Sequence, residues 1–275
     1  MNVAVVGHVE WVEFARVEDV ARAGEIVHAL ETWEEPAGGG ALAAVQLANL
    51  NGSVRFFTSL GDDDHGRQAR EQLAARGVTV HAASAGVPQR RAFTFVDEVG
   101  ERTITVLGRK LVPSGADGSL PWEELARCDA VYFVSGDVAA LRAARHCDVL
   151  VATARELPTL GRAGVPVDVL VGSGEDAAER FEPGGLDPEP QIVVTTAGAL
   201  GGWIRPGGPF RAAPIPGDVS DAYGCGDCFA AGLTYGLAER EPVDEAVAIG
   251  ARCGAAVLTG RGAYERQLTA ADLRV

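Results

Sequence analysis

Lysine is nearly absent from this chain. Of its 24 lysine and arginine side chains only Lys110 is a lysine, and 38 aspartates and glutamates bring the net charge at pH 7 to −14. Non-specific binding to nucleic acid depends on dense positive charge, which an acidic chain does not offer. We therefore expect no nucleic-acid partner.

Long apolar runs and a disulfide framework are absent as well. No stretch reaches the ~20 apolar residues that a membrane span requires, and Met1 leads directly into a strand-like segment. The cysteines are odd in number and lack the spacing of paired bridges. They are Cys128, Cys147, Cys225, Cys228 and Cys253. These absences predict a cytoplasmic protein without a membrane partner.

Several nucleotide-binding motifs are missing too. The chain has no Gly-x-x-x-x-Gly-Lys-Ser/Thr loop, no Gly-x-Gly-x-x-Gly after its first strand-like segment, and neither the His-Arg-Asp nor the Asp-Phe-Gly motif of protein kinases. A P-loop kinase, a dinucleotide oxidoreductase and a protein kinase are therefore disfavoured.

Short β-branched segments alternate with alanine- and leucine-rich segments of helical period. The strand-like segments are 3–7, 54–60, 91–96, 102–107, 130–135, 149–154, 167–171 and 191–195. The helical segments include 41–50, 65–76, 121–128 and 138–144, and the last third adds 229–238 and 243–258. This alternation predicts an α/β protein, a three-layer αβα sandwich with a mostly parallel central sheet. The length fits one domain over residues 1–275.

Two regions depart from the alternation. Residues 9–35 are charged and weakly periodic, and 91–107 has the pattern of a hairpin around Glu98-Val99-Gly100-Glu101. We expect segments within 9–35 and 88–110 to form a small antiparallel flap beside the main sheet. It is either a lid over the site or an edge extension that contacts a second copy, and the two roles are compatible.

Residues 218–232 (DVSDAYGCGDCFAAG) carry the strongest functional signal. Gly224 and Gly226 stand just before Asp227, and a small, apolar, helical run follows. Glycines let consecutive N–H groups turn toward one point, where a helix N-terminus adds partial positive charge. The segment predicts an anion hole with a carboxylate at its edge, which suits phosphoryl transfer to a hydroxyl.

The segment resembles the Asp-Thr-x-Gly-Ala-Gly-Asp signature of the ribokinase-like (PfkB) carbohydrate kinase family, with Cys225 in place of the usual alanine. Three further segments resemble motifs of the same family, in the family's order. They are 36–52 (PAGGGALAAVQLANLNG), 58–66 (TSLGDDDHG) and 193–201 (VVTTAGALG). Four motifs spread over nearly the whole chain make the match specific, and it implies a ribokinase-like fold.

The resemblance implies a role for each matched position. Asp227 would be the general base that takes a proton from the substrate hydroxyl. Backbone amides of Gly224, Cys225 and Gly226 would cradle the transferring phosphoryl oxygens. The remaining matched positions would line the two binding sites: Thr196, Gly198 and Gly201 for the nucleotide, and Gly39 and Gly40 for the sugar-like substrate.

The chain departs from the family where substrate and metal would bind. The asparagine that usually touches the substrate is replaced within residues 41–43, and Glu10 or Glu13 stands for the aspartate after the first strand. His8 lies just past that strand, where α/β sheets bind ligands, and is a candidate substrate contact. The Asn-x-x-Glu motif that organises magnesium through water has become Ser-Gly-Glu-Asp at 173–176, which leaves Asp176 as a candidate metal ligand. Asp221, in the segment 218–232, is a separate candidate, for binding a cation or for organising its loop.

Cys225 and Cys228 form a Cys-x-x-Cys pair, but no second pair accompanies it, so a redox or zinc site is disfavoured. The position of Cys225 at a helix start predicts a lowered thiol pKa and sensitivity to oxidation. Trp11 is expected either to stack on a substrate ring or to pack within the lid. His65 is expected in a surface cluster at a helix start.

Together these features predict an enzyme: an ATP-dependent kinase for a sugar, sugar acid or nucleoside, with sugar first. It would use Mg²⁺, a monovalent cation is left open, and a homodimer through the lid is one expectation. The alternative is a catalytically idle homologue that binds a sugar or nucleotide as a sensor or partner protein. The departures favour that alternative, and Asp227 opposes it, since a binding protein needs no base.

Overall fold

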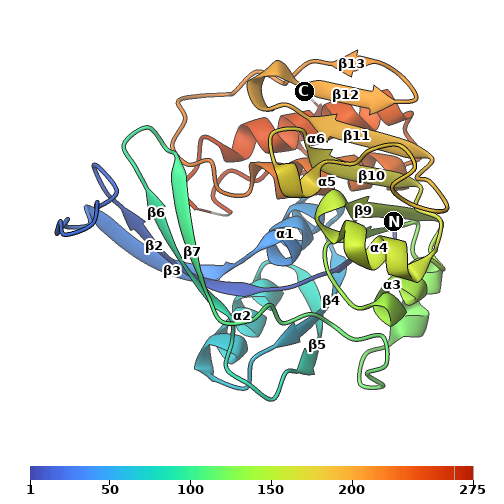
Figure 1. The fold of residues 1–275 in the computed structure, drawn as a ribbon, viewed down its shortest axis with the longest axis horizontal. Helices are drawn as coiled ribbons and strands as arrows, with labels where there is room; N and C mark the ends of the chain where they lie inside the picture. Colours follow the sequence, from blue (N-terminus) through green and yellow to red (C-terminus); the bar gives the residue numbers. More distant parts are fainter. Residues whose placement is uncertain (263, 275) are drawn as a thin grey trace.

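A nine-stranded sheet forms the centre of the computed structural model, which describes residues 1–262 and 264–274 (Figure 1). Its strand order is β13-β12-β11-β10-β9-β8-β1-β4-β5. The strands are β1 (Val3–Val6), β4 (Val54–Leu60), β5 (Val78–Ser84), β8 (Ala130–Phe133), β9 (Val149–Thr153), β10 (Val169–Ser173), β11 (Ile192–Thr196), β12 (Gly202–Arg205) and β13 (Pro209–Phe210). Neighbours from β5 to β11 pair in parallel, and β12 and β13 add an antiparallel edge.

Helices cover both faces of this sheet. One apolar core joins Val3 and Val5 of β1 to α1 (Gly39–Asn51), α2 (Asp64–Ala75), α5 (Cys225–Ala238) and α6 (Val243–Val257). A second core joins Ala4 and Val6 to α3 (Val138–Ala144) and α4 (Leu157–Ala163). Successive side chains of a strand point to opposite faces, so β1 supplies both cores. The predicted three-layer sandwich is confirmed.

The helices not yet named are short 3₁₀ turns. They are η1 (Trp122–Arg127), η2 (Ala154–Glu156), η3 (Ala177–Glu179), η4 (Gly198–Leu200) and η5 (Asp272–Arg274). The helical segment predicted at 121–128 is thus a 3₁₀ turn. In the part of the chain that the structure describes, no helix has the length and apolarity needed to cross a membrane.

A second sheet stands beside the first, built from β3 (Glu31–Ala37), β2 (Glu10–Arg16), β6 (Arg91–Val96) and β7 (Arg102–Leu107) in that order. The prediction of a purely antiparallel flap is wrong in one pairing. β2 and β6 run parallel, because the chain returns through β4, α2 and β5 before β6 begins. The predicted hairpin between β6 and β7 is confirmed.

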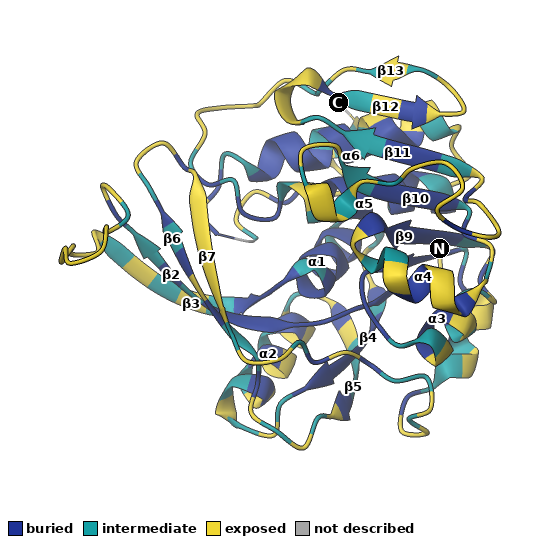
Figure 2. Cartoon of the chain, viewed as in Figure 1, coloured by how far each residue is buried: buried dark blue, intermediate teal, exposed yellow. Residues whose placement is uncertain are grey.

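One face of this second sheet packs on the body. Val12 and Phe14 of β2 share an apolar cluster with Leu42 of α1 and with Tyr223, which precedes α5. The Trp33 ring stacks on Phe14 with 4.9 Å between centroids. The edge strand β7 is exposed along most of its length (Figure 2).

Close packing of α5 on α6 fixes the helix that carries the catalytic candidates. Glycines on both helices bring the backbones together: a Cβ added at Gly232 would lie 2.9 Å from Gly250 Cα, and one added at Gly250 would lie 2.7 Å from Phe229 O. A side chain at either position would push the helices apart.

This packing yields a stability prediction. Gly250→Ala should lower the free energy of unfolding by about 1–3 kcal/mol, because the added methyl group overpacks the α5–α6 contact. Gly161→Ala in α4 is the matched control. A Cβ there meets no atom closer than 3.7 Å, so helix propensity should raise stability by up to about 1 kcal/mol. Urea unfolding measures both, and equal shifts in one direction would contradict the packing argument.

Candidate active site

The starts of α1 and α5 meet at the carboxyl ends of β1 and β8. A Cβ added at Gly39, in the first turn of α1, would lie 2.6 Å from Asp227 Oδ1 and 3.1 Å from Val134 Cγ1. One added at Gly40 would lie 2.6 Å from His8 O. Glycine is therefore required at both positions, and the predicted residues Gly39, Gly40, His8 and Asp227 are brought together.

Asp227 lies in the first turn of α5 and carries a shifted carboxyl group. Burial raises the pKa of Asp227 to about 6; the charges of Arg155 and Arg102 lower this pKa, while those of Glu179 and Glu10 raise it. A carboxyl group that titrates near neutral pH can accept a proton from an alcohol and later release it. This is the property that the predicted general base requires.

The helix start beside Asp227 offers backbone N–H groups that no carbonyl of the helix accepts, and those of Cys225 and Gly226 lie against the Cys225 thiol. Gly224 is the N-cap residue of α5, with φ 83° and ψ 5° in the left-handed region, and a Cβ there would lie 2.8 Å from Leu42 Cδ2. The first intrahelical bond runs from Cys228 N–H to Gly224 O. The preceding N–H groups have no partner within the helix and point along the dipole. Gly226 is exposed, with open space around its Cα.

α5 therefore begins earlier than its apolar pattern suggested. The sequence predicted a helix over 229–238, whereas the structure begins it at Cys225. Gly226 and Asp227 lie within the first helical turn rather than in a loop ahead of it. The N–H groups of the predicted anion hole are those of the helix terminus itself.

Cys225 differs from its expectation. Burial is the largest influence on the thiol and raises its pKa, which outweighs the nearby Arg102 charge and the backbone N–H groups. The prediction that the helix start lowers this pKa is therefore wrong. Cys225 is free, as are the other four cysteines.

Asp221 is buried beneath the loop that leads into α5. Its Oδ1 accepts the Tyr223 N–H at 2.8 Å, and its Oδ2 accepts the Gly262 N–H at 3.0 Å. Burial raises the pKa of Asp221, and these two bonds counter the rise. Both carboxylate oxygens therefore organise the backbone around them.

Asp176 and Glu179 hold an arginine that the sequence reading missed. Arg155, just after β9, lies 2.5 Å from Asp176 Oδ2 and 2.7 Å from Glu179 Oε1. Asp176 Oδ1 accepts the Ala178 N–H, and Glu179 Oε2 accepts the Ser173 N–H. Arg155 is the largest favourable charge acting on Asp227. No local pattern in the sequence indicates Arg155, because its partners lie more than 20 residues away.

The two candidate metal ligands, Asp221 and Asp176, each have other partners in the structure. Asp221 bonds to backbone amides, and Asp176 is paired with Arg155. Over residues 1–262 and 264–274, no cluster of three or more histidine, cysteine, aspartate or glutamate side chains could hold a metal ion. The described side chains do not fit a direct metal site.

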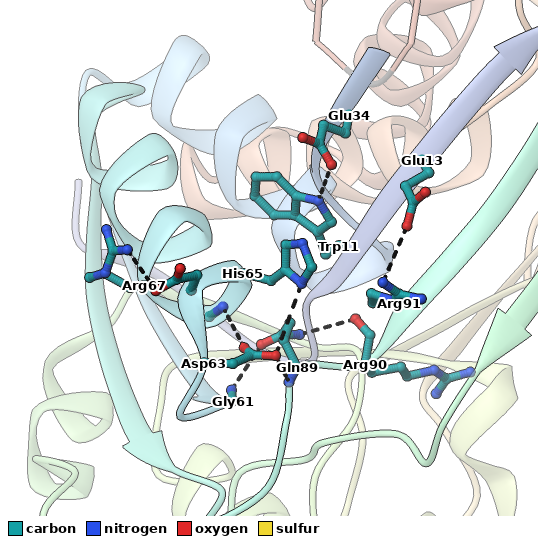
Figure 3. A network of polar contacts seen from close by, with 12 residues as sticks. Trp11, Glu13, Glu34, Gly61, Asp63, His65, Arg67, Gln89, Arg90 and Arg91 are labelled. Atoms are coloured by element: carbon teal, nitrogen blue, oxygen red, sulfur yellow. Dashed lines mark hydrogen bonds and ion pairs between the residues drawn. The ribbon is translucent and has the colours of Figure 1, made fainter. Parts of the chain in front are cut away.

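His8 and Glu10 lie beside the start of α1: a Cβ added at Gly38 would lie 3.2 Å from Glu10 Cγ and 3.4 Å from His8 Cδ2. His8 Nδ1 lies 3.0 Å from Ser135 Oγ, and Glu10 pairs with Arg90 at 2.9 Å. Burial holds the pKa of His8 well below its usual value, and Lys110, Arg90 and Arg155 lower it further. His8 is therefore neutral at pH 7 and can both donate and accept a hydrogen bond. Glu13 pairs instead with Arg91 of β6 (Figure 3).

A polar network supports this wall of the site (Figure 3). Trp11 is only 1% exposed, stacks on His65 at 5.2 Å, and donates from Nε1 to Glu34 Oε2. Of the two roles considered for Trp11, packing is the one that the structure supports. Gln89 Oε1 accepts the Gly61 N–H, and Gln89 Nε2 donates to the carbonyl of Val9, which stands between His8 and Glu10.

The predicted nucleotide-loop residues cluster at the end of β11. Thr196 ends the strand and its carbonyl accepts the Gly174 N–H at 2.8 Å. Gly198 and Gly201 have φ of 52° and 92° in the turn into β12, and Leu200 between them is 85% exposed. The loop is thus open and adjoins the segment that carries Asp176.

Comparisons with known proteins agree with this architecture. A sequence model described as "pfkB family carbohydrate kinase" matches residues 1–140 and 134–270. An ATP-dependent ribose-1-phosphate kinase of Halopiger xanaduensis is 28% identical, covering 96% of this chain and 94% of that protein. A fructokinase of Klebsiella pneumoniae is 29% identical, covering 83% of this chain and 87% of that protein.

Solved structures share the fold. A ribokinase from Thermotoga maritima superposes with a TM-score of 0.80 at 20% identity, covering 100% of this chain and 98% of that one. A ribokinase from Cryptococcus neoformans in complex with ADP gives 0.77 at 21% identity, covering 99% and 98%.

The shifted carboxyl group yields a prediction on stability. The pKa of Asp227 in the folded protein, about 6, lies above the value of about 4 expected in the unfolded chain. Ionised Asp227 therefore destabilises the fold, fully above pH 6 and not at all below about pH 4. Asp227→Asn should raise the unfolding free energy by at most about 3 kcal/mol at pH 8, and by about half as much at pH 5.

Urea unfolding at the two pH values measures this gain. Asp218→Asn removes the same charge from an exposed position and should change stability by less than about 0.5 kcal/mol. An Asp227→Asn gain that does not grow with pH would contradict the assigned shift.

Proposed function

Since this chain belongs to the pfkB family of carbohydrate kinases, we propose that it transfers the γ-phosphoryl group of ATP to a hydroxyl of a sugar or sugar-like molecule. The observation that carries the proposal is the meeting of Gly39, Asp227 and the open start of α5. ATP as donor is supported by the name of the Halopiger relative and by the ADP-bound ribokinase.

We assign the chemistry to the start of α5. Asp227 accepts the proton of the substrate hydroxyl while the hydroxyl oxygen attacks the γ-phosphorus of ATP. The bond from the γ-phosphorus to the β,γ-bridging oxygen breaks, and ADP leaves. Backbone N–H groups of Gly224, Cys225 and Gly226 bind the charge that develops on the phosphoryl oxygens. Fixed donors in a partly buried site stabilise that charge without reorganisation.

The two substrates would bind to different groups of residues around the start of α5. Thr196, Gly198 and Gly201 would line the nucleotide site, where the exposed loop leaves room for the adenine ring. His8, Glu10, Gly39 and Gly40 would line the substrate site. A neutral His8 and a carboxylate suit hydroxyl groups, so a sugar comes first, before a sugar acid or a nucleoside.

Metal ions would enter with the nucleotide. Mg²⁺ usually binds through substrate phosphates with few protein ligands and several waters, so the proposed requirement for Mg²⁺ needs no contact with Asp176 or Asp221. A monovalent cation would bind near the loop that carries Asp221.

We further propose that the second sheet, from segments within 9–35 and 88–110, serves as a lid. Its packing against Leu42 and Tyr223 holds it beside the residue that precedes the start of α5. Strand β7 leaves an exposed edge with Ile104 and Val106 at 42% and 43% exposure. Such an edge favours pairing with a second copy, so a homodimer through the lid is part of the proposal.

The alternative of an idle sugar or nucleotide sensor has one observation in its favour. Arg155 occupies Asp176 and Glu179 in the segment where the family organises magnesium. The raised pKa of Asp227 opposes it, since binding alone gains nothing from a destabilising carboxylate.

A turnover assay tests the proposal. Purified protein with ATP and Mg²⁺ should phosphorylate at least one member of a panel of sugars, sugar phosphates, sugar acids and nucleosides. Asp227→Asn should fold normally and lose about 10²–10⁴-fold in kcat. Turnover comparable to wild type would end the assignment of the base, and ligand binding without wild-type turnover would favour the sensor.

The pH dependence of kcat/KM provides a second test, because kcat/KM reports the ionisation of the free enzyme. Since Asp227 acts ionised, kcat/KM should fall about tenfold per pH unit below pH 6. Arg155→Gln removes the charge that most lowers this pKa, so the acid limb should move to higher pH. Arg155→Lys keeps the charge and should leave the limb close to wild type; an unmoved limb in Arg155→Gln would contradict the electrostatic role.

A further inference from the structure

The hairpin between β6 and β7 ends in a tip with a fixed shape. Asp97 Oδ1 accepts the N–H groups of Val99 at 3.1 Å and Glu101 at 2.8 Å, and the Gly100 N–H donates to Asp97 O at 3.0 Å. Gly100 has φ 79°, in the left-handed region. One carboxylate and one glycine thus define the turn.

This tip contacts the segment that leads into α5. The Ala222 N–H donates to Gly100 O at 3.0 Å. A Cβ added at Gly100 would lie 3.1 Å from both Ser220 C and Ser220 O. Gly100 is buried while its neighbour Val99 is 70% exposed, so the tip meets the segment through Gly100. Figure 1 shows the hairpin beside the chain that enters α5.

The same segment is held from two further directions. From the second sheet, Arg16 of β2 places Nη1 3.3 Å from Ser220 O and Nη2 3.4 Å from Ser220 Oγ. From the body, Leu258 O accepts the N–H groups of Ser220 and Asp221. Residues 220–222 are therefore bonded to the second sheet on one side and to the end of α6 on the other.

The bonds continue from this segment into the helix start. Asp221 fixes the Tyr223 N–H, and the Tyr223 ring packs edge-on against Phe14 of β2 at 5.0 Å. Tyr223 is followed directly by Gly224, the N-cap residue of α5. The position of the helix start thus depends on contacts from a sheet other than the one on which α5 packs.

We propose that Gly100 is a positioning residue for the anion hole: its carbonyl, held by the Asp97 turn, orders residues 220–224 and with them the N–H groups of Gly224, Cys225 and Gly226. The catalytic consequence rests on the proposed function, whereas the ordering of the segment does not.

A pair of glycine variants tests the inference. Gly100→Ala introduces a Cβ against Ser220. Gly108, with φ 89°, directly follows β7 of the same sheet, and a Cβ added there meets no atom within 4 Å, so Gly108→Ala is the matched control. Both variants carry left-handed strain, so they share the general cost of the substitution. Only Gly100→Ala should speed hydrogen–deuterium exchange of the peptide 220–227 and lower kcat at least ~10-fold, with KM for ATP changed less than about threefold.

Equal exchange and equal kcat in the two variants would overturn the inference. Should Gly100→Ala not fold, Asp97→Ala loosens the same tip without a clash, and it should change both readouts in the same direction. Faster exchange in a protein without any kinase turnover would sink the proposed function and leave the ordering role standing. Kinase turnover of the wild type, with exchange and kcat unchanged in Gly100→Ala, would overturn the ordering role and leave the proposed function standing.

Discussion

The close approach of Gly39 to the Asp227 carboxylate is the contact on which the candidate site depends. It places the first turns of α1 and α5 against each other, with 2.6 Å between Oδ1 and a hypothetical Cβ. The same approach removes water from Asp227 and so contributes to its raised pKa. A larger residue at position 39 would separate the two helix starts, and with them the proposed base and the proposed donors.

Charge around this contact is balanced rather than neutralised. Arg155 lowers the pKa of Asp227 while Glu179, one of its own partners, raises it. Burial raises the pKa of Asp227, and these opposing charges leave it at about 6, where a base can both take up and release a proton. A ligand set for a metal would need these carboxylates free, so the arginine and the altered magnesium motif are consistent with each other.

The fold was largely predictable, because strand and helix periods are local. The alternating segments, the β6–β7 hairpin and the three-layer arrangement follow from patterns within a few residues. The parallel pairing of β2 with β6 did not, since it joins segments separated by a complete strand–helix–strand crossover. The start of α5 was placed late because Gly226 and Asp227 have poor helix propensity, which packing on α6 overrides.

The sequence by itself determined which segment we propose for the reaction and the order of the family motifs along the chain, because glycines and an acid before an apolar helix are recognisable wherever they fold. Only the tertiary structure decided what surrounds them. Each of these contacts joins segments that are distant in the sequence: the ion pairs of Arg155, the hydrogen bond from the Gly262 N–H to Asp221, the packing of Trp11 beside Glu34, and the hydrogen bond between Gly100 and Ala222. Such pairings depend on distances in space, which no local spacing of residues encodes.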